Sequence, residues 1–528
     1  MQWVVLQTDA LFFALIAIAT LYALAAMRHE PMRAPWREVA ANPFAASSAV
    51  VLAVFVGVAL LDSVHFHPRI ERAEASAVGA EAVAGSAGES AESSESGQSG
   101  EPGEAGQSGQ SGQSGQSGQS GQSGDNPQVG EPQYSTEILS LLDVVLRPLR
   151  EHTERSYSAP FATHAFSKEL IELPDGGTRR DYPRLEHGGA HLFATETNAS
   201  EVPQMVRSKA ADIAMRAGFG GLRGLVIIGL LALLASAIAG HPGQLRRTLT
   251  GEGRSTRRTV WTTLTLVVVL ISVLAALGTH WHILGTDKVG NDVLYQAIKS
   301  IRTGILIGTL TTLVMLPLAL LLGVAAGYFR GWVDDVIQYL YTTLSSIPGV
   351  LLIAAMALLL EAYMARNAEL FTSLTARADL KLLALCAILG VTSWTGLCRL
   401  LRGEVLKVRE IEFVQAARSL GVGHARILSR HLLPNVMHIV MISIVLDFSN
   451  LVLAEAVLSY INIGVDPTME SWGNMINSAR LELARDPVVW WSLVAAFLFM
   501  FTLVLAANLF ADAVRDAFDP RLRMRGGE

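Results

Sequence analysis

The sequence predicts an all-α polytopic membrane protein. Its 528 residues are 51% hydrophobic and only 17% charged, whereas soluble globular proteins average about a quarter charged. The apolar residues are gathered into runs of about 17 to 25 residues, the length that a helix needs to cross about 30 Å of hydrocarbon. Such runs are too long and too uniformly apolar for the strands of a membrane barrel.

Nine of these runs are predicted transmembrane helices. They cover Ala10–Met27, Ala45–Leu61, Gly224–Gly240, Val260–Gly278, Ile305–Phe329, Val336–Leu360, Leu382–Leu401, Val436–Ile461 and Val488–Phe510. Pro317 and Pro348 lie inside two of the runs, where proline kinks a helix. Cys386 and Cys398 lie in the seventh run, about 18 Å apart along a helix axis, so we expect no disulfide between them.

Basic residues predict how the chain is oriented, because short loops rich in Arg and Lys stay on the cytoplasmic side. Four basic clusters follow the first, third, seventh and last spans, and all four fall on one side if the N-terminus is outside. Their members are Arg28, Arg33 and Arg37; Arg246, Arg247, Arg254, Arg257 and Arg258; Arg402, Lys407, Arg409, Arg418, Arg426 and Arg430; and Arg515, Arg521, Arg523 and Arg525. We therefore expect a bacterial inner-membrane protein with its N-terminus and residues 62–221 periplasmic, and residues 412–435 and the C-terminus cytoplasmic. The second span is the weakest point of this topology, because it is short.

An insert of about 160 residues separates the second and third spans. Residues 62–133 are of low complexity, with Gly-Gln-Ser triplets over 106–123, and predict a disordered extracytoplasmic linker. Residues 134–221 predict a small α+β extracytoplasmic domain, with a helix over 136–152, a hairpin around Asp175-Gly176-Gly177 and a helix over 200–218. Its histidines lack regular metal-ligand spacing, so no metal site is expected; they are His152, His164, His187 and His191.

A polar segment over residues 412–435 interrupts the apolar runs. The pattern predicts a short helix, a corner at Gly421, where glycine tolerates a sharp change of direction, and a second helix stopped by Pro434. The segment has small side chains at Ala416 and Ala417 and carries positive charges elsewhere. Two interpretations stay open: an element that docks in a partner's cleft, or a solvated amphipathic loop at the lipid headgroups.

The same segment resembles the coupling loop of ATP-binding-cassette (ABC) importer membrane subunits. The similarity lies in Gln415-Ala416-Ala417, Gly421 and Leu432-Leu433-Pro434, with Gln415 in place of the family's usual Glu. The resemblance implies that this loop fits a groove on a separate ATP-binding subunit, and we expect Ala417 to enter that groove.

A second block, Leu284–Val293, resembles the signature of the C-type subunits of dipeptide, oligopeptide and nickel permeases. The matching positions are Gly285, Thr286, Asp287, Gly290 and Asp292, and Asn291 stands where Arg is usual. The resemblance extends over about Val260 to Arg523. It implies a six-helix permease core in residues 260–528, preceded by about three extra helices in residues 1–61 and 222–259, the last with a basic cytoplasmic loop.

The resemblance implies transport of peptides or similar solutes, with three kinds of protein partner. These are ATP-binding subunits, a second homologous permease subunit and an extracytoplasmic substrate-binding protein; the chain also contacts the lipid bilayer, and no nucleic acid is expected. The sequence has no Gly-Lys dipeptide and so no phosphate-binding loop. The chain is therefore expected to be non-catalytic and without a cofactor, with ATP and Mg bound by the partner. The alternatives are a membrane-anchored ligand-binding scaffold, or a permease for a non-peptide substrate such as nickel.

Polar residues inside the eighth span are candidates for the substrate pathway, because polar groups at membrane depth are costly. Asp447, Asn450 and Glu455 share one helical face by their spacing, and Trp394 in the seventh span is a weaker candidate. Interhelical hydrogen bonding is the alternative role for the same residues.

Overall fold

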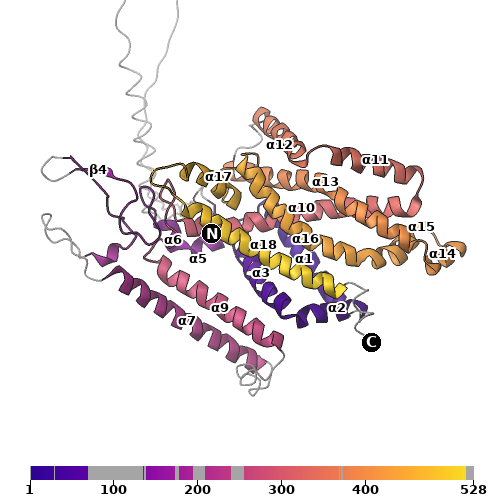
Figure 1. The fold of residues 1–528 in the computed structure, drawn as a ribbon, viewed down its shortest axis with the longest axis horizontal. Helices are drawn as coiled ribbons and strands as arrows, with labels where there is room; N and C mark the ends of the chain where they lie inside the picture. Colours follow the sequence, from indigo (N-terminus) through magenta and orange to yellow (C-terminus); the bar gives the residue numbers. More distant parts are fainter. Residues whose placement is uncertain are drawn as a thin grey trace, which may run out of the picture. The chain divides into compact units, whose positions relative to one another are not determined.

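The computed structural model describes residues 2–28, 30–68, 135, 138–172, 178–193, 208–238, 255–367, 369 and 373–518. Most of them are helical (Figure 1). Among the residues so described, nine helices are long and apolar enough to span a membrane, which confirms the predicted number. The Gly-Gln-Ser tract over 106–123 lies outside the described residues.

The chain forms two compact units, of which one is small. The units are Met1–Val4 with His65–Leu139, and Val5–Val64 with Ser140–Glu528. In the small unit, strands β1 (Gln2–Val4) and β2 (His65–His67) pair antiparallel with Trp3 opposite Phe66, and the two rings meet edge to face at 6.0 Å. All the long helices belong to the large unit.

Three helices begin the large unit: α1 (Gln7–Arg28), α2 (Glu30–Ala41) and α3 (Pro43–Asp62). The corner between α2 and α3 is built by Asn42, whose side-chain oxygen accepts from the backbone N–H of Phe44 at 2.9 Å, the usual chemistry of an N-cap. Helix α1 contacts α10 and α13, and α3 contacts α10 and α18. The extra N-terminal helices therefore pack directly on the predicted permease core.

The insert differs from expectation in its first helix. The helix predicted over 136–152 is instead strand β3 (Leu139–Ser140) followed by two one-turn helices, α5 (Leu141–Val145) and α6 (Arg147–Glu151). Pro148 lies in the first turn of α6, where its missing N–H costs nothing; in a continuous helix the same residue would lose a hydrogen bond.

The predicted hairpin is confirmed by strands β4 (Glu169–Glu172) and β5 (Thr178–Asp181), which pair antiparallel. The turn at 173–177 lies outside the described residues. A short 3-10 helix, η1 (Ala190–Leu192), completes the described part of the insert.

Helices α7 (Lys209–Ile238) and α9 (Ser255–Gly278) pack side by side as a long pair (Figure 1). Two glycines allow the close approach: a side chain at Gly220 would come within 2.8 Å of the Cα of Val273, and one at Gly224 within 2.8 Å of the Cα of Val269. Helix α7 begins at Lys209, so the boundary drawn from the sequence between residues 221 and 222 falls inside a single helix.

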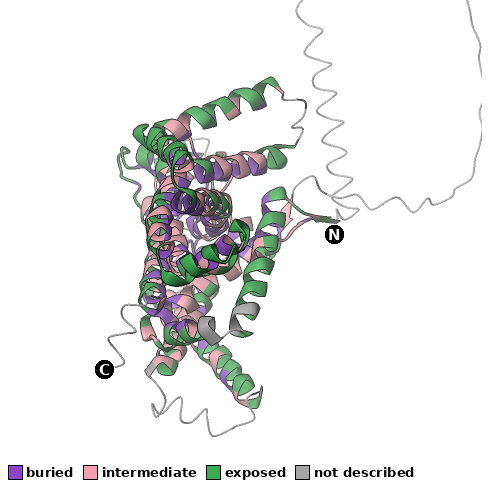
Figure 2. Cartoon of the chain, turned by 90° about the vertical axis from the view of Figure 1, so that its right-hand side faces the viewer, coloured by how far each residue is buried: buried purple, intermediate pink, exposed green. Residues whose placement is uncertain are grey.

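The centre of the large unit is the pair α10 (Val293–Phe329) and α13 (Leu374–Val408). A side chain at Gly323 would lie 2.8 Å from the carbonyl oxygen of Cys398, so glycine permits this contact. Helices α16 (Leu433–Tyr460), α17 (Trp472–Glu482) and α18 (Trp491–Phe518) complete the bundle. Buried residues gather where these helices pack, and many outward faces are exposed (Figure 2). Cys386 and Cys398 are buried free thiols, as expected.

The sixth predicted span, Val336–Leu360, is not a single helix, so this prediction was wrong. It consists of two helices, α11 (Trp332–Ser346) and α12 (Gly349–Arg366), separated at Ile347 and Pro348. Ile347 adopts an extended conformation, as expected for a residue whose αR conformation is disfavoured by the proline that follows it. Pro348 therefore ends one helix and begins another, whereas Pro317 lies within the continuous α10.

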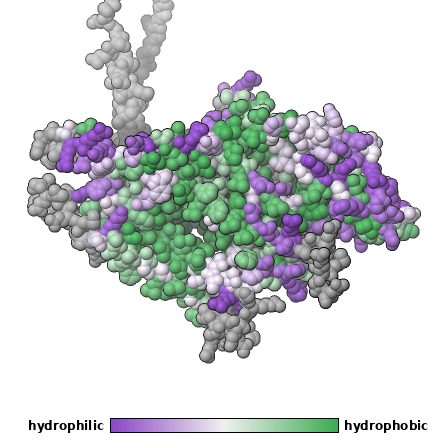
Figure 3. All heavy atoms as spheres, viewed as in Figure 1, coloured by the Kyte–Doolittle hydropathy of each residue, from purple (hydrophilic) through white to green (hydrophobic). Residues whose placement is uncertain are grey.

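Different elements lie at the two ends of the bundle. The described end of α18, helix α2 and the short helix α14 (Glu412–Ser419) lie towards the right and lower right of Figure 1, and β4, α5 and α6 towards the left. Hydrophobic residues cover much of the middle of this face, and hydrophilic ones gather at both ends, including the end with α14 (Figure 3).

Candidate functional site

The polar segment 412–435 forms a helix, a corner and a second helical stretch, as predicted. Helix α14 ends in a Schellman arrangement: Gly421 N–H donates to the carbonyl of Arg418 at 3.1 Å, and Val422 N–H donates to the carbonyl of Ala417 at 3.1 Å. Gly421 has φ +75°, and no atom outside its immediate neighbourhood lies within 4 Å of the position a Cβ would take. Glycine is favoured here by its backbone conformation and not by crowding.

The two faces of α14 have different surroundings. Val414 and Ala417 are buried in the chain's own core, whereas Gln415 and Ala416 are exposed. The expectation that Ala417 enters a partner's groove is therefore wrong, because Val414 and Ala417, three residues apart, both point inward. Ala416 is the small residue on the open face.

The open face of the segment carries apolar side chains in a polar surface. Leu420 is 83% exposed, Ile411 45% and Phe413 43%. Three arginines of the same segment are exposed as well: Arg418, Arg426 and Arg430. We call the exposed residues Ile411, Phe413, Ala416 and Leu420 the α14 patch.

Polar contacts surround the start of this segment, and one of them reaches the segment itself. The hydroxyl of Tyr328 hydrogen-bonds His424 at 2.7 Å, and Arg409 donates to the carbonyl of Tyr328 at 2.6 Å. Arg402 donates to Asp334 through two nitrogens, at 2.5 and 2.7 Å, a planar and charge-assisted contact. The contact between Tyr328 and His424 thus joins the segment to α10, and the contact between Arg402 and Asp334 joins α13 to α11.

The second helix does not stop at Pro434. Helix α15 (His424–Ile427) continues through the π-helical turn η3 (Leu428–Leu432) into α16. Pro434 occupies the first turn of α16, so it interrupts no regular α-helical hydrogen bond there. The prediction that Pro434 ends the helix is wrong. The wider π-helical turn Leu428–Leu432 leads directly into α16. Leu432 is fully buried and Leu433 partly buried against the core.

The signature block lies at the opposite end, in the loop between α9 and α10. Asp292 caps α10 by accepting from the N–H groups of Leu294 and Tyr295, and Asp287 accepts from Asn291 N–H at 2.8 Å. Gly290 has φ +88°. A Cβ there would lie 1.7 Å from the carbonyl oxygen of Glu154, so no side chain fits.

The rest of the signature also contacts the insert. Thr286 is buried; its hydroxyl oxygen accepts from Ser158 N–H at 2.7 Å and donates to the carbonyl of Ser156 at 2.9 Å. Gly285 has φ +72°, and a Cβ there would lie 2.4 Å from the carbonyl oxygen of Ser158. The carbonyl of Thr286 accepts from the indole of Trp491 at 2.9 Å. The signature therefore joins the insert to α18.

A buried charged cluster missed at the sequence level completes this junction. His282 contacts Asp292 through Nδ1 at 2.8 Å and Glu154 through Nε2 at 3.2 Å. Burial by itself lowers the pKa of His282, but hydrogen bonds to the two carboxylates outweigh it and raise that pKa to about 9. Burial raises the pKa of Glu154, yet His282 and the N–H groups of three insert residues lower it to about 2. Both shifts favour the charged form of His282 beside the carboxylate of Glu154. In the sequence, the closeness of His282 to Asp292, ten residues later, was the only sign that these two residues pair. Nothing in the sequence linked Glu154 to either of them.

The candidate pathway residues do not share one environment. Glu455 is buried and accepts from the hydroxyl of Ser459 at 2.7 Å, Asp447 is half-buried and Asn450 is exposed. Trp394 is buried among apolar residues of α10, α13 and α16. The buried contacts of Glu455 and Trp394 are those of residues that stabilise helix packing. Asp447 and Asn450 are more accessible than these two residues.

Comparisons with known proteins show similarity over part of the chain. A family model described as the binding-protein-dependent transport system inner membrane component matches residues 319–524. The glutathione transport system permease protein GsiD of Pectobacterium atrosepticum is 30% identical over 244 residues, 46% of this chain and 73% of that protein. The oligopeptide transport system permease protein OppC of Mycobacterium bovis is 32% identical over 244 residues, 46% of this chain and 77% of that protein. The dipeptide transport system permease protein DppC of Lactococcus lactis is 30% identical over 240 residues, 46% of this chain and 64% of that protein.

Proposed function

Because the chain belongs to the family of binding-protein-dependent transport system inner membrane components, we propose that it forms the translocation pathway of an ABC importer for peptides or similar solutes. It works with a second permease subunit, two ATP-binding subunits and an extracytoplasmic substrate-binding protein. The names of the relatives support peptides as the substrate class, since they refer to glutathione, dipeptide and oligopeptide transport.

One observation carries the proposal: the α14 patch is apolar, exposed and outside the apolar runs. Leu420 is 83% exposed at an end of the molecule whose surface is mostly polar (Figure 3). An exposed apolar patch rimmed by charges is typical of a protein interface. The patch is therefore the docking site of the ATP-binding subunit, and the contact between Tyr328 of α10 and His424 joins this segment to the spans.

In this proposal the end with α14 is cytoplasmic and the end with the insert is periplasmic. The basic clusters support this orientation. In the first cluster, Arg28 ends α1, and Arg33 and Arg37 belong to α2. The described members that follow the seventh and last spans belong to the end of α13 with the segment after it, and to the end of α18. The insert then lies on the side where a substrate-binding protein delivers its ligand.

The test of docking places a charge on the open face. Ala416→Asp buries an unpaired carboxylate in the interface, which costs several kcal/mol, so association with the ATP-binding subunit falls by roughly a hundredfold. The measurement is a pull-down of the co-expressed ATP-binding subunit beside a blot of membrane abundance. Ala34→Asp is the matched control, because Ala34 is an exposed alanine of α2 outside the α14 patch. Equal association for Ala416→Asp and Ala34→Asp refutes the docking role.

The test of orientation uses a new cysteine at Ser117. An impermeant thiol reagent should label Ser117→Cys in intact spheroplasts. The unmodified chain is the control, since its two cysteines are buried. Labelling only after lysis contradicts a periplasmic insert.

A further inference from the structure

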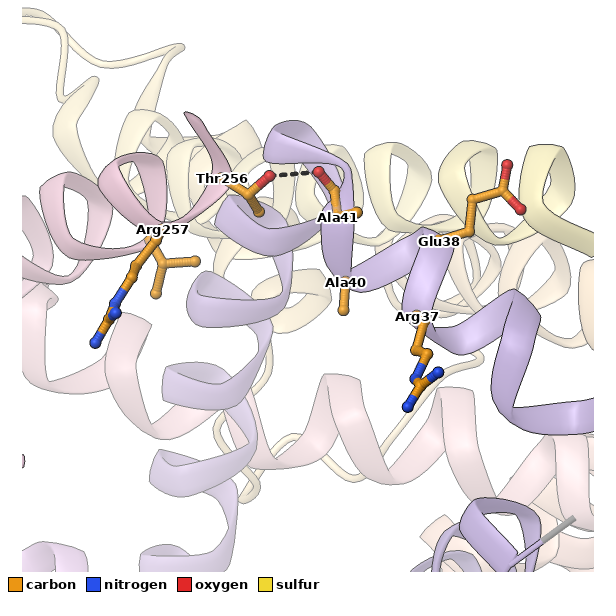
Figure 4. A pocket seen from close by; sticks show the side chains of 7 residues that line it. Arg37, Glu38, Ala40, Ala41, Thr256 and Arg257 are labelled. Carbon is orange, nitrogen blue, oxygen red and sulfur yellow. Dashed lines mark hydrogen bonds between the residues drawn. The ribbon is translucent and has the colours of Figure 1, made fainter. Parts of the chain in front are cut away.

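The core of the large unit is covered on one side by helices of the same chain. Helices α2 and α3 contact α18, α3 also contacts α10, and α1 contacts α10 and α13. The start of α9 is joined to the corner between α2 and α3 by a hydrogen bond from the Thr256 hydroxyl to the carbonyl of Ala41 (Figure 4). Helix α16, in contrast, packs on the core helices α10, α13, α17 and α18, and part of its surface stays open.

The open surface of α16 contains a regular row of exposed side chains. Its members are Leu446, Asn450, Leu453, Val457 and Tyr460, which we call the α16 row. The intervals between them alternate between four and three residues, which is the spacing of the contact positions in a coiled coil. All members except Asn450 are large and apolar or aromatic. A row of this kind fits another helix that crosses at a shallow angle of about 20°.

Asn450 disfavours lipid as the neighbour of this row. It lies near the middle of the apolar run Val436–Ile461, and within the described part of the chain its side chain has no hydrogen-bond partner. An unpaired amide at membrane depth is costly. An amide that hydrogen-bonds to a residue of a second helix instead strengthens the association of the two helices.

Helix α18 carries a surface suited to lipid in the same molecule. Between Trp491 and Phe510 its exposed residues are all apolar, namely Val494, Phe497, Leu498, Phe501, Leu505 and Leu509. The α16 row differs from this surface by its polar member at membrane depth and by its coiled-coil spacing. Both differences favour a protein helix as its neighbour.

The open surface of α16 also has a polar side. Ser443 and Asp447 are half-buried. At about 100° of rotation per residue, both lie beyond Asn450 on the side away from Leu453 and Val457. A polar strip of this kind is suited to water and solute. The open surface therefore divides into an apolar row for a helix and a polar strip beside it.

We propose that the α16 row is the contact of this chain with the second permease subunit, and that it packs there against the corresponding helix of that subunit. The inference rests on the proposed function, which supplies this partner. Homologous subunits pair about a two-fold axis, so corresponding elements meet. The two helices then run parallel, and Asn450 meets a residue at its own depth. Ser443 and Asp447 line the space beside the contact, along which the solute passes.

The first experiment identifies the neighbour by photo-crosslinking. The full chain is co-expressed with the ATP-binding subunits and an epitope-tagged second permease subunit, and the photoreactive residue p-benzoylphenylalanine replaces Leu453. The same replacement at Leu498 of α18 is the matched control, because both positions are exposed leucines of apolar helices. Position 453 should give at least about tenfold more adduct with the tagged subunit, because benzophenone bonds only to groups in contact with it.

A second experiment tests Asn450. Asn450→Leu should weaken co-purification of the two permease subunits by about 3- to 20-fold, the effect of one hydrogen bond between membrane helices. Asn508→Leu is the matched control, because Asn508 is a half-buried asparagine of α18 outside the α16 row. Asn450→Gln keeps an amide and should give an intermediate loss; it also serves if Asn450→Leu does not fold. Equal co-purification for Asn450→Leu and Asn508→Leu overturns the role of Asn450.

Thiol labelling separates the contact from the polar strip. A charged, water-soluble thiol reagent should modify Ser443→Cys and leave Leu453→Cys unmodified in the assembled complex. The native Cys386 and Cys398 are buried and supply the background. Rapid labelling of both new cysteines shows water along the whole surface and overturns the contact. Adducts from position 453 with phospholipid alone, or with a second copy of this chain, overturn the choice of partner.

Peptide uptake and a pull-down of the ATP-binding subunit from the same membranes keep the two proposals distinguishable. Adducts with the second permease subunit in the absence of ATPase association refute the transport role and leave the contact standing. ATPase association and uptake without such adducts refute the contact alone.

Discussion

Asp9 of α1 and Arg302 of α10 form a buried ion pair, in which Arg302 donates to Asp9 at 2.6 Å. Their side chains are 0% and 7% exposed. The hydroxyl and N–H of Thr8, next in the chain, both donate to Asp379 of α13. The first helix, which lies outside the six-helix core implied by the resemblance, is thus bonded to the two central helices of that core.

Removing one partner of this pair should destabilise the chain strongly. Asp9→Asn leaves Arg302 as a buried and uncompensated charge, at a cost of about 3–5 kcal/mol. The measurement is the temperature at which the buried Cys386 and Cys398 react with a thiol dye. The double change Asp9→Leu with Arg302→Met should recover much of the loss, since apolar replacement of a buried pair is often neutral.

An exposed ion pair supplies the control for that experiment. Arg147 and Glu151 are 2.7 Å apart but 71% and 53% exposed, so Glu151→Gln should cost less than about 1 kcal/mol. Similar losses for Asp9→Asn and Glu151→Gln would show that α1 is only loosely attached.

The His282 cluster should make stability depend on pH. The pKa of His282 is raised from 6.5 to about 9, so its stabilisation is complete below about pH 6.5 and is lost as the pH rises through 9. The pKa of Glu154 is lowered from 4.5 to about 2, so its contribution is present above about pH 4.5 and is lost towards pH 2. The thermal stability of the native chain relative to His282→Gln should be greatest near pH 6 and smaller at pH 9.5. A difference that is constant over this range contradicts the assignment of a charged His282.

The corner after α14 should require glycine at one position and not at its neighbour. Gly421 has φ +75°, where an L side chain costs about 1–2 kcal/mol, whereas Gly423 has φ −60°. Neither has atoms that would clash with a Cβ. Gly421→Ala should therefore weaken association with the ATP-binding subunit, and Gly423→Ala should leave it within twofold, as measured by pull-down.

If Asp447 lines the pathway, Asp447→Asn should lower uptake of a labelled peptide in membrane vesicles while the complex stays assembled on a native gel. Asp447 is half-buried, so its side chain is accessible. Glu455→Gln is the comparison. Glu455 is buried and accepts a hydrogen bond from Ser459, so Glu455→Gln should reduce the amount of assembled complex, and uptake should fall only in proportion. Unchanged uptake for Asp447→Asn would remove this residue from the pathway.

Several features could be predicted from the sequence because their causes are local. Apolar runs of membrane length predict helices from composition alone, and the Asp-Gly-Gly turn predicts the β4–β5 hairpin. The Gly421 corner follows from the conformational freedom of a single residue. The similarity to known permeases also rested on short blocks of adjacent residues.

Other features were decided only by tertiary packing. The sequence could not distinguish the break at Pro348 from the kink it predicted, or show that the π-helical turn lets the helix pass Pro434, because both depend on what neighbouring helices allow. The sequence placed Ala416 and Ala417 together, and packing on the core decided which of them is exposed.

The charged contacts that join the extra parts to the core are the clearest case. Asp9 and Arg302 are 293 positions apart and Glu154 and His282 are 128 apart, so no local pattern relates them. The sequence by itself determined which segments become helices, because that depends on hydrophobicity and on residues a few positions away. Only the tertiary structure decided which charges are buried together, because the cost of burying a charge is offset only by a partner that folding brings within hydrogen-bond distance.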